Sequence, residues 1–393
     1  MSGQTSSVVV RAGTEWRAAA RAALPRFLFD YIDGSAGAGI TTARNHADLA
    51  ATVLPQTVLT DVGKMDLTTD LFGQRLSMPV ALGPVGLAGL YSKRGEAAAA
   101  RAAQDAGIPF TLSTLGVCSA EEVARAAAPP WFQLYMMQDR AFFRDLLHDV
   151  AAVGCSTLVL TVDVPVPGIR HADRLSGLDA SGTLAGQLRL AGQTAVRPGW
   201  AWNVGLRGRP HRFGNILSAV PDARGLKDYW PWIGRNFDPS VDIHALEEVR
   251  ALWSGTLLVK GVLQVEDARA VVAAGADGLI ISNHGGRQLD GAGSTAAALR
   301  DIRAALGDNT PLLVDGAIRS GADVARYIAL GADVCLLGRL WAYALAAGGE
   351  QGVGSCLAGL RKELGSTLAL CGASTPRALR GRSADPLNSS GIV

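Results

Sequence analysis

The residues with the clearest chemical potential lie in the stretch Ser282–Asp290, which reads Ser-Asn-His-Gly-Gly-Arg-Gln-Leu-Asp. It follows an apolar run, 278–281, whose length and composition predict a buried strand. His284 can accept a proton near neutral pH, and Arg287 can hold a carboxylate through two parallel hydrogen bonds. The two glycines between them permit backbone conformations that other residues resist. The string alone is equally consistent with a glycine-rich turn carrying two incidental polar residues, so its meaning depends on the fold around it.

Short β-rich runs alternate with Ala-rich helical segments from residue 79 onward. Strands are predicted at 79–83, 109–113, 131–135, 157–162, 256–260, 277–282, 311–315 and 333–337. Helices are predicted at 95–106, 119–128, 141–153, 243–253, 265–274, 295–305 and 320–329. This alternation predicts an α/β fold of the (β/α)8 TIM-barrel type, in which catalytic residues lie at the carboxyl ends of the strands. A doubly wound open sheet is the alternative, disfavoured because no Gly-x-Gly-x-x-Gly turn follows the first strand.

The whole chain, 1–393, is expected to form one domain. Its predicted parts are a helical N-terminal segment (1–75, with helices at 15–23, 25–32 and 42–50), the barrel (76–371), an insert after the fourth strand (164–240) and a loosely held tail (372–393). The insert is far too long for an ordinary connection between a strand and a helix.

Composition excludes several classes of protein. The chain is 48% apolar and 18% charged, which predicts a globular core, and its net charge of +2 gives no reason to expect a nucleic-acid partner. The first eleven residues contain one short apolar run, so no signal peptide is predicted, and no apolar run approaches the roughly 18 residues that span a bilayer. Five scattered cysteines indicate reduced thiols in a cytoplasmic protein, and the histidines show no metal-ligand spacing, so no metal is expected.

The insert has an unusual charge pattern. Residues 181–220 contain five arginines and no acidic residue, and Trp200, Trp202, Trp230 and Trp232 lie within or just after this stretch. A basic segment with interfacial tryptophans is typical of contact with anionic lipid headgroups, which would place the protein on the inner face of the cell membrane. A mobile loop that covers the barrel mouth is an equally good interpretation.

Every predicted strand ends near a residue that can do chemistry, which is hard to assign to chance. Asp163, at the end of the fourth strand, is a candidate to orient His284, as a carboxylate orients the catalytic histidine in other enzymes. Arg319 and Arg339 follow the seventh and eighth strands, where barrels often bind phosphate. A phosphate-bearing cofactor is therefore expected.

The sequence resembles the FMN-dependent α-hydroxy-acid dehydrogenase and oxidase family, in particular its bacterial quinone-linked, L-lactate-oxidising branch. The stretch 282–288 carries most of this resemblance, and 24–34, 76–82, 200–206 and 236–240 support it. The resemblance implies that His284 is the active-site base with Asp163 as its partner. It implies that the substrate carboxylate is held by Arg170, Arg287, Tyr31 and Tyr135. The implied FMN-binding residues are Pro84, Val85, Gly86, Ser113, Gln133, Thr161, Lys260, Ser282, Asp315, Gly316, Ala317, Arg319, Gly338 and Arg339, with Lys260 at the flavin N1–O2 edge.

The implied reaction is the oxidation of an L-2-hydroxy acid, with L-lactate as the first choice, to the 2-oxo acid. Electrons would pass to FMN, either as a hydride or through a carbanion, and then to a quinone or another respiratory acceptor. The alternatives within the enzyme class are a soluble oxidase that uses O2 and a mandelate-type dehydrogenase. A flavin-free barrel acting as a binding protein is the alternative outside it. The resemblance also implies a homo-oligomer, a tetramer or an octamer.

Overall fold

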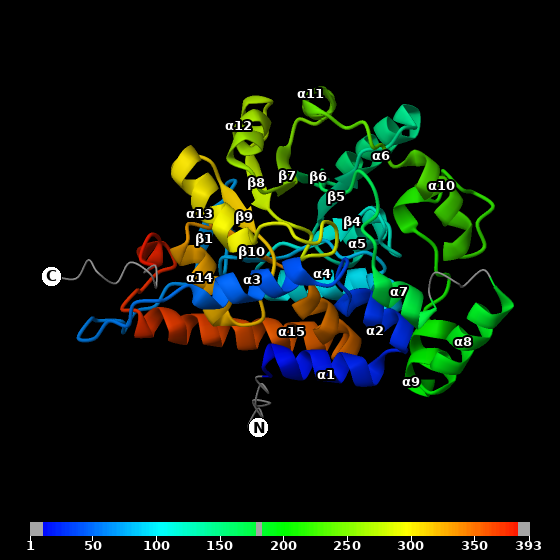
Figure 1. Cartoon of the computed structure of the whole chain (residues 1–393), viewed down its shortest axis with the longest axis horizontal. Coiled ribbons are helices and arrows are strands. Elements are labelled where there is room, and N and C mark those ends of the chain that lie inside the picture. The colour runs from blue at the N-terminus through cyan, green and yellow to red at the C-terminus, as the bar shows by residue number, and fades with distance from the viewer. Residues whose placement is uncertain (1–10, 178–182, 384–393) are drawn as a thin grey trace.

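The computed structural model describes residues 11–177 and 183–383, and its centre is a barrel of eight parallel strands (Figure 1). The strands are β3 (Val80–Leu82), β4 (Thr111–Ser113), β5 (Trp131–Tyr135), β6 (Thr157–Thr161), β7 (Thr256–Val262), β8 (Gly278–Ile281), β9 (Leu312–Val314) and β10 (Val334–Leu337). Their order in the sheet is β3-β10-β9-β8-β7-β6-β5-β4, and a parallel bridge between Leu82 and Phe110 joins the two ends. The predicted TIM barrel is confirmed, and the open doubly wound sheet is excluded.

Helices surround the barrel, as the alternating pattern predicts. They are α4 (Gly95–Asp105), α5 (Ala120–Ala126), α6 (Arg140–Ala152), α11 (Ile243–Leu252), α12 (Val265–Ala273), α13 (Thr295–Leu306), α14 (Gly321–Ala329) and α15 (Arg339–Leu370). Several begin at a side chain that accepts a hydrogen bond from the first turn, such as Ser294 for α13 and Ser320 for α14. The 32-residue α15 was not among the predicted helices, and it contains a kink at Gly348 and Gly349.

The N-terminal segment is only partly helical. Helices α1 (Gly13–Ala23), α2 (Arg26–Asp33) and α3 (Ile40–Ala51) match the prediction closely. Beyond them an antiparallel hairpin, β1 (Thr69–Leu71) with β2 (Gln74–Leu76), corrects the prediction of a helical segment up to residue 75. Leu71 and Leu76 pack against inward-facing strand residues such as Val159 and Leu258. The hairpin therefore covers the amino end of the barrel, opposite the strand ends that carry polar residues.

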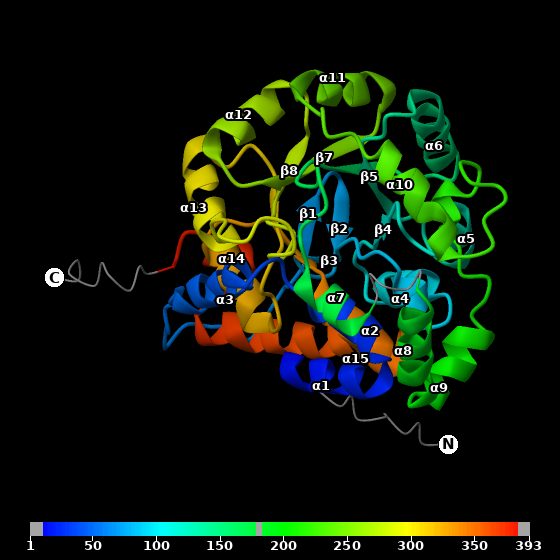
Figure 2. The same ribbon diagram turned by 45° about the vertical axis from the view of Figure 1, so that its right-hand side comes forward.

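The described residues of the insert are largely helical. They form α7 (His171–Ser176), α8 (Leu184–Ala195), α9 (Pro198–Trp200), the π-helix η2 (Ala201–Leu206), η3 (Gly214–Ile216), η4 (Leu226–Tyr229) and α10 (Trp230–Asn236). Helices α8 and α9 stand at the periphery near α2, as both views show (Figures 1 and 2). Gln193 accepts a hydrogen bond from Phe27 N, and Trp200 Nε1 donates to Leu90 O. The two ends of the insert, residues 164–174 and the elements η4 and α10, line the mouth of the barrel, so these parts match the interpretation of the insert as a cover.

The beginning of the predicted tail is packed rather than loose. The 3-10 helix η5 (Arg377–Leu379) buries Leu379 completely, and Arg380 forms an ion pair with Asp333 at the start of β10. The rest of the tail, 384–393, lies outside the described residues. The five cysteines are all free and buried, in agreement with the prediction of reduced thiols.

Candidate active site

A pocket of about 1190 Å³ opens at the carboxyl ends of the strands. Its volume exceeds the range of about 300–1,000 Å³ usual for a drug-sized ligand, so it has room for a cofactor and a small substrate together. It is lined by residues at the carboxyl ends of seven of the barrel strands and by the loop after the remaining strand, β8. Residues of α2 and of the insert also line it. Of the twenty residues predicted to belong to the site, eighteen line this pocket, and Asp163 and Ser282 do not. 

The predicted cofactor-binding residue Ser282 lies behind the pocket wall, where its hydroxyl accepts a hydrogen bond from Lys260 Nζ. Val85 lines the pocket from the loop after β3 and packs partly against the core. Of the predicted catalytic pair, His284 lines the pocket and Asp163 lies behind it.

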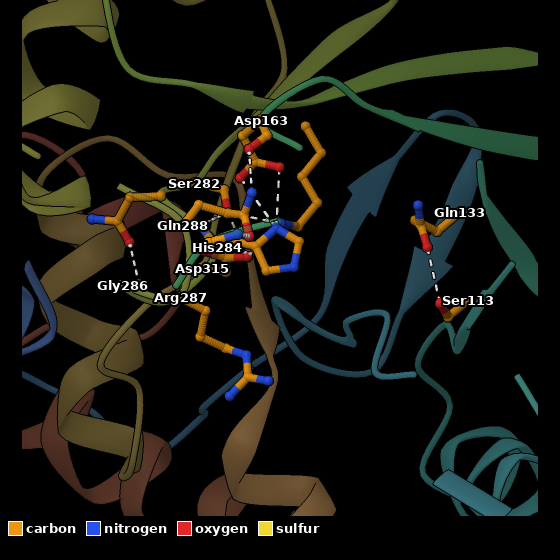
Figure 3. A network of polar contacts seen from close by, with 12 residues as sticks. Ser113, Gln133, Asp163, Ser282, His284, Gly286, Arg287, Gln288 and Asp315 are labelled. Carbon is orange, nitrogen blue, oxygen red and sulfur yellow. Dashed lines mark hydrogen bonds and ion pairs between the residues drawn. The ribbon is translucent and has the colours of Figure 1, made fainter. Parts of the chain in front are cut away.

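His284 and Asp163 lie in direct contact. His284 Nδ1 is 3.1 Å from Asp163 Oδ1 and 3.3 Å from Oδ2, and Figure 3 shows the carboxylate against the imidazole ring. Burial lowers the pKa of His284, and the positive charge of Lys260 lowers it further, against the opposing effect of Asp163. Burial opposes ionisation of Asp163, but His284 and Lys260 outweigh it and keep the carboxyl pKa below its usual value. The pair therefore presents a neutral imidazole backed by a carboxylate, which is the arrangement of a general base.

Lys260 forms a second polar group with Ser282 and Asp315, and Figure 3 shows these last two beside the pair. Lys260 Nζ donates to Ser282 Oγ at 2.8 Å and lies 3.2 Å from Asp315 Oδ2. Ser282 Oγ donates to the same carboxylate and accepts from His284 N at 3.0 Å. Burial acts to lower the pKa of Lys260, but Asp315 and Asp163 outweigh it and raise the pKa. The structure thus maintains a fixed positive charge on the floor of the pocket.

Two arginines and two tyrosines form another part of the wall. The guanidinium of Arg287 lies 5.0 Å from the ring centre of Tyr31, and that of Arg170 lies 6.0 Å from the same ring. Burial lowers the pKa of Arg287, and the neighbouring charge of Arg170 lowers it further. Tyr135 closes this wall from the end of β5, with its phenol pKa raised by burial. Two cations held this close together favour binding of an anion such as a carboxylate.

Buried polar atoms test whether FMN fits the pocket. Gln133 Nε2, Thr161 Oγ1 and Asp315 Oδ1 are buried and have no hydrogen-bond partner among the described residues. All three belong to pocket-lining side chains from β5, β6 and the end of β9. Buried polar groups are normally paired, so three free ones in one pocket indicate a polar ligand. Donors and acceptors of this kind suit the carbonyl and ring nitrogen atoms of an isoalloxazine and the hydroxyls of its ribityl chain.

The two arginines predicted to bind phosphate differ in their contacts. Arg319 lines the pocket, and its Nη1 donates to Ile318 O. Arg339 also lines it, but three of its nitrogens already donate to the backbone carbonyls of Ile32, Gly34 and Gly285. Burial, together with the neighbouring charges of Arg287 and Arg319, lowers the pKa of Arg339 to about 9. Arg319 is therefore the better candidate for direct contact with phosphate. Arg339 also links the end of α2 to the loop after β8 through its hydrogen bonds.

Three pocket residues have contacts that sequence patterns did not single out. Gln288 Nε2 donates to Asp163 O and Val166 O, while its Oε1 accepts from Gly168 N and Arg170 Nη2. Tyr91 donates to Gly86 O at 2.9 Å. The ring of Phe237, from the insert, packs 4.8 Å from that of Tyr135. Gln288 belongs to the motif at 282–288 and Phe237 to the supporting stretch 236–240, whereas Tyr91 had no signal in the sequence.

Comparisons with known proteins give the family. The sequence profile of the FMN-dependent dehydrogenases matches residues 20–385. The chain belongs to the FMN-dependent dehydrogenase family. It is 53% identical over 366 residues to an L-lactate dehydrogenase of Caulobacter vibrioides (strain NA1000 / CB15N), covering 93% of this chain and 95% of that protein. It is 51% identical over 369 residues to the L-lactate dehydrogenase of Alcaligenes faecalis, covering 94% and 97%.

Solved structures agree with this assignment. The monotopic membrane protein (S)-mandelate dehydrogenase superposes with a TM-score of 0.89 at 35% identity, over 95% of this chain and 99% of that one. Mandelate oxidase bound to (S)-4-hydroxymandelic acid superposes with a TM-score of 0.82 at 35% identity, over 95% and 98%. This FMN-dependent dehydrogenase is therefore an enzyme, and the alternative of a flavin-free binding barrel is excluded.

Proposed function

We propose that this FMN-dependent dehydrogenase oxidises L-lactate to pyruvate. The observation that carries the proposal is the neutral His284, backed by Asp163 at 3.1 Å, in the same pocket as Arg170 and Arg287. A 2-hydroxy acid offers a carboxylate for the arginines and a proton for the histidine. The curated L-lactate dehydrogenases at 51–53% identity support L-lactate as the substrate.

The protein's own residues have three tasks in this reaction. Arg170 and Arg287 bind and orient the carboxylate, helped by the hydroxyls of Tyr31 and Tyr135. His284 accepts a proton from the substrate through Nε2, since Nδ1 faces Asp163, and the carboxylate stabilises the resulting imidazolium. FMN, held by the pocket residues named above, supplies the acceptor of the two electrons. Lys260 stabilises negative charge that develops on the cofactor.

We further propose that the insert binds a membrane surface and that a quinone takes the electrons onward. Leu184 and Leu188 lie one turn apart on α8, and Trp202 and Leu206 lie four residues apart on η2; all four side chains are more than half exposed. Exposed apolar side chains near Arg207 and Arg209 suit the interface of an anionic bilayer. No helix among residues 11–177 and 183–383 is long and apolar enough to cross a membrane. A homo-oligomer of four or eight chains stays a prediction.

The test of the reaction is anaerobic. The FMN-loaded protein is mixed with L-lactate, D-lactate or (S)-mandelate, and bleaching of the flavin absorbance is followed. Fast bleaching by L-lactate alone supports the proposal, whereas faster bleaching by (S)-mandelate would assign the chain to mandelate-type substrates. Reoxidation by a quinone in vesicles is then compared with reoxidation by O2, and a fast reaction with O2 alone would establish the soluble oxidase.

Membrane binding has a matched control. The double variant Leu184→Glu/Leu188→Glu should no longer co-sediment with anionic vesicles. Leu59→Glu, at a fully exposed leucine outside the insert, should sediment like the parent. Both should reduce flavin with L-lactate at the parental rate. Parent protein that ignores vesicles would refute the membrane proposal and leave the reaction untouched.

A further inference from the structure

A buried pair of amides joins the N-terminal segment to the loop that carries the base. Asn45, on α3, donates from Nδ2 to Asn283 Oδ1 at 2.8 Å, and Asn283 Nδ2 donates back to Asn45 Oδ1 at 2.7 Å. Their exposed fractions are 1% and 5%. Asn283 directly precedes His284, so a residue 238 positions earlier in the chain is hydrogen-bonded beside the proposed base.

The other polar atoms of the pair hold the two ends of the same loop. Asn283 Oδ1 also accepts from Gly286 N at 3.2 Å. Asn283 Nδ2 donates a second time, to Gly293 O at 3.0 Å, and Asn45 Oδ1 accepts from Thr295 N at 3.2 Å. A network in which every member is satisfied specifies one geometry strongly. The pair therefore fixes the loop both where it leaves β8 and where it enters α13.

This loop needs such support because its backbone is unusual. His284, Gly285 and Gly286 have φ angles of +57°, +65° and +73° in succession. A histidine in the left-handed region persists only where its surroundings determine the conformation. Relaxation of His284 toward negative φ would carry its ring away from Asp163. Other contacts from the N-terminal segment assist, since Thr42 Oγ1 donates to Gly285 O.

We propose that Asn45 is a positioning residue for His284. Through Asn283 it holds the backbone of the base in the left-handed conformation, so that the imidazole stays against Asp163 and faces the substrate. Asn45 itself does not line the pocket. An asparagine suits the position because its side chain supplies the donor and the acceptor that the amide of Asn283 requires. The proposal rests on the proposed function insofar as it takes His284 as the base.

The test compares Asn45→Ala with Leu49→Ala. Leu49 is one turn further along α3, is 1% exposed, and packs in the core without lining the pocket, so its truncation destabilises the same helix without touching the loop. Three quantities are measured. The first two are the melting temperature and the rate constant of anaerobic flavin reduction per bound FMN at saturating L-lactate. The third quantity is the pKa of His284 from NMR of ¹⁵N-labelled histidine, with the signal assigned by its loss in His284→Ala. A displacement of about 1 Å in a catalytic group can cost about 10²-fold in rate, so a loss of about 10- to 100-fold is expected for Asn45→Ala.

The two variants should differ in kind. Leu49→Ala should melt at a lower temperature and keep the parental rate and the parental His284 pKa. Asn45→Ala should lose rate, and its His284 pKa should move up toward the ordinary 6.5 as water reaches the ring. If Asn45→Ala fails to fold, Asn45→Asp keeps the volume but sets an acceptor against Asn283 Oδ1, and the same losses are expected. A parental rate and an unshifted pKa in a folded Asn45 variant would overturn the proposal. Failure of the parent to be reduced by any L-2-hydroxy acid would instead refute the proposed function, and the NMR titration would still decide the positioning role.

Discussion

Replacement of Asp163 by asparagine tests the central pair of the site. The carboxylate lies 3.1 Å from His284 Nδ1, and both side chains are largely shielded from water. At an effective dielectric of about 20, opposite unit charges at this distance attract by roughly 5 kcal/mol. An asparagine retains a hydrogen bond, and Lys260 already offsets part of the carboxylate's charge. The imidazolium should therefore lose about 3–4 kcal/mol of stabilisation, or about 10²–10³-fold in the rate of proton transfer.

The assay is stopped-flow reduction of the bound flavin by L-lactate without oxygen, at several pH values. Asp163→Asn should keep its FMN, because Asp163 does not line the pocket, and should show the slower rate at pH 7. Asp242→Asn is the control, since Asp242 caps α11 outside the pocket and asparagine caps a helix equally well.

The pH dependence has a definite sign. The active form of His284 is neutral, so kcat/KM rises with pH through the pKa of the free enzyme. Asp163 acts to raise that pKa, so the variant's acidic limb should move to lower pH even as the maximum falls. A rate within about threefold of the parent, or an acidic limb moved to higher pH, would refute the assigned role of Asp163.

Three other substitutions separate the parts of the site. Arg287→Lys should keep FMN but raise KM about 10- to 100-fold, because a lysine loses the two-point contact, worth about 1.5–3 kcal/mol; an unchanged KM in steady-state assays would remove Arg287 from the substrate site. Arg319→Ala should yield a paler protein that regains flavin, and then parental reduction, as FMN is added; full occupancy at low FMN, measured by absorbance, would contradict a phosphate contact. Lys260→Met should shift the flavin midpoint potential to more negative values, because the reduced ring loses a positive neighbour, and dye equilibration would show no shift if Lys260 is only structural.

The barrel was predictable because its strands are short apolar runs with strong local signals. The runs that became β3 to β10 lie within a few residues of their predicted positions, and polar residues follow them at one end. The hairpin at 69–76 was missed because strands of three residues are too short to show alternation. The helix α15 was missed because glycines interrupt it, two of them at the kink, and its stability comes from packing on α1, α4 and α14.

The candidate site was predictable in its membership more than in its contacts. Strand ends converge in any barrel, so His284, Asp163 and Lys260 were expected to meet without knowledge of distances. Arg339 shows the limit, because nothing in the sequence indicated that it also donates hydrogen bonds to carbonyls of α2 and the loop after β8. Asn45 is a clearer example of a contact that the sequence does not predict. No periodic pattern relates it to Asn283, and their contact exists only because α3 packs across the loop between β8 and α13.

The insert belongs to the active site as much as to the surface of the protein. Asn215 accepts from Ala120 N at the start of α5 and donates to Ser113 O, the last residue of β4. Near its other end, Asp238 pairs with Arg140 at the start of α6, and the adjacent Phe237 packs on Tyr135. These two anchors hold the strand ends that contribute Ser113 and Tyr135 to the pocket. The exposed pocket-rim residue Trp230 lies between these anchors, and the exposed face of α8 and η2 precedes the first of them. The same segment therefore supports the pocket wall and presents apolar side chains to the outside. The surface proposed to bind the membrane is joined through this segment to the strand ends that form the proposed substrate site.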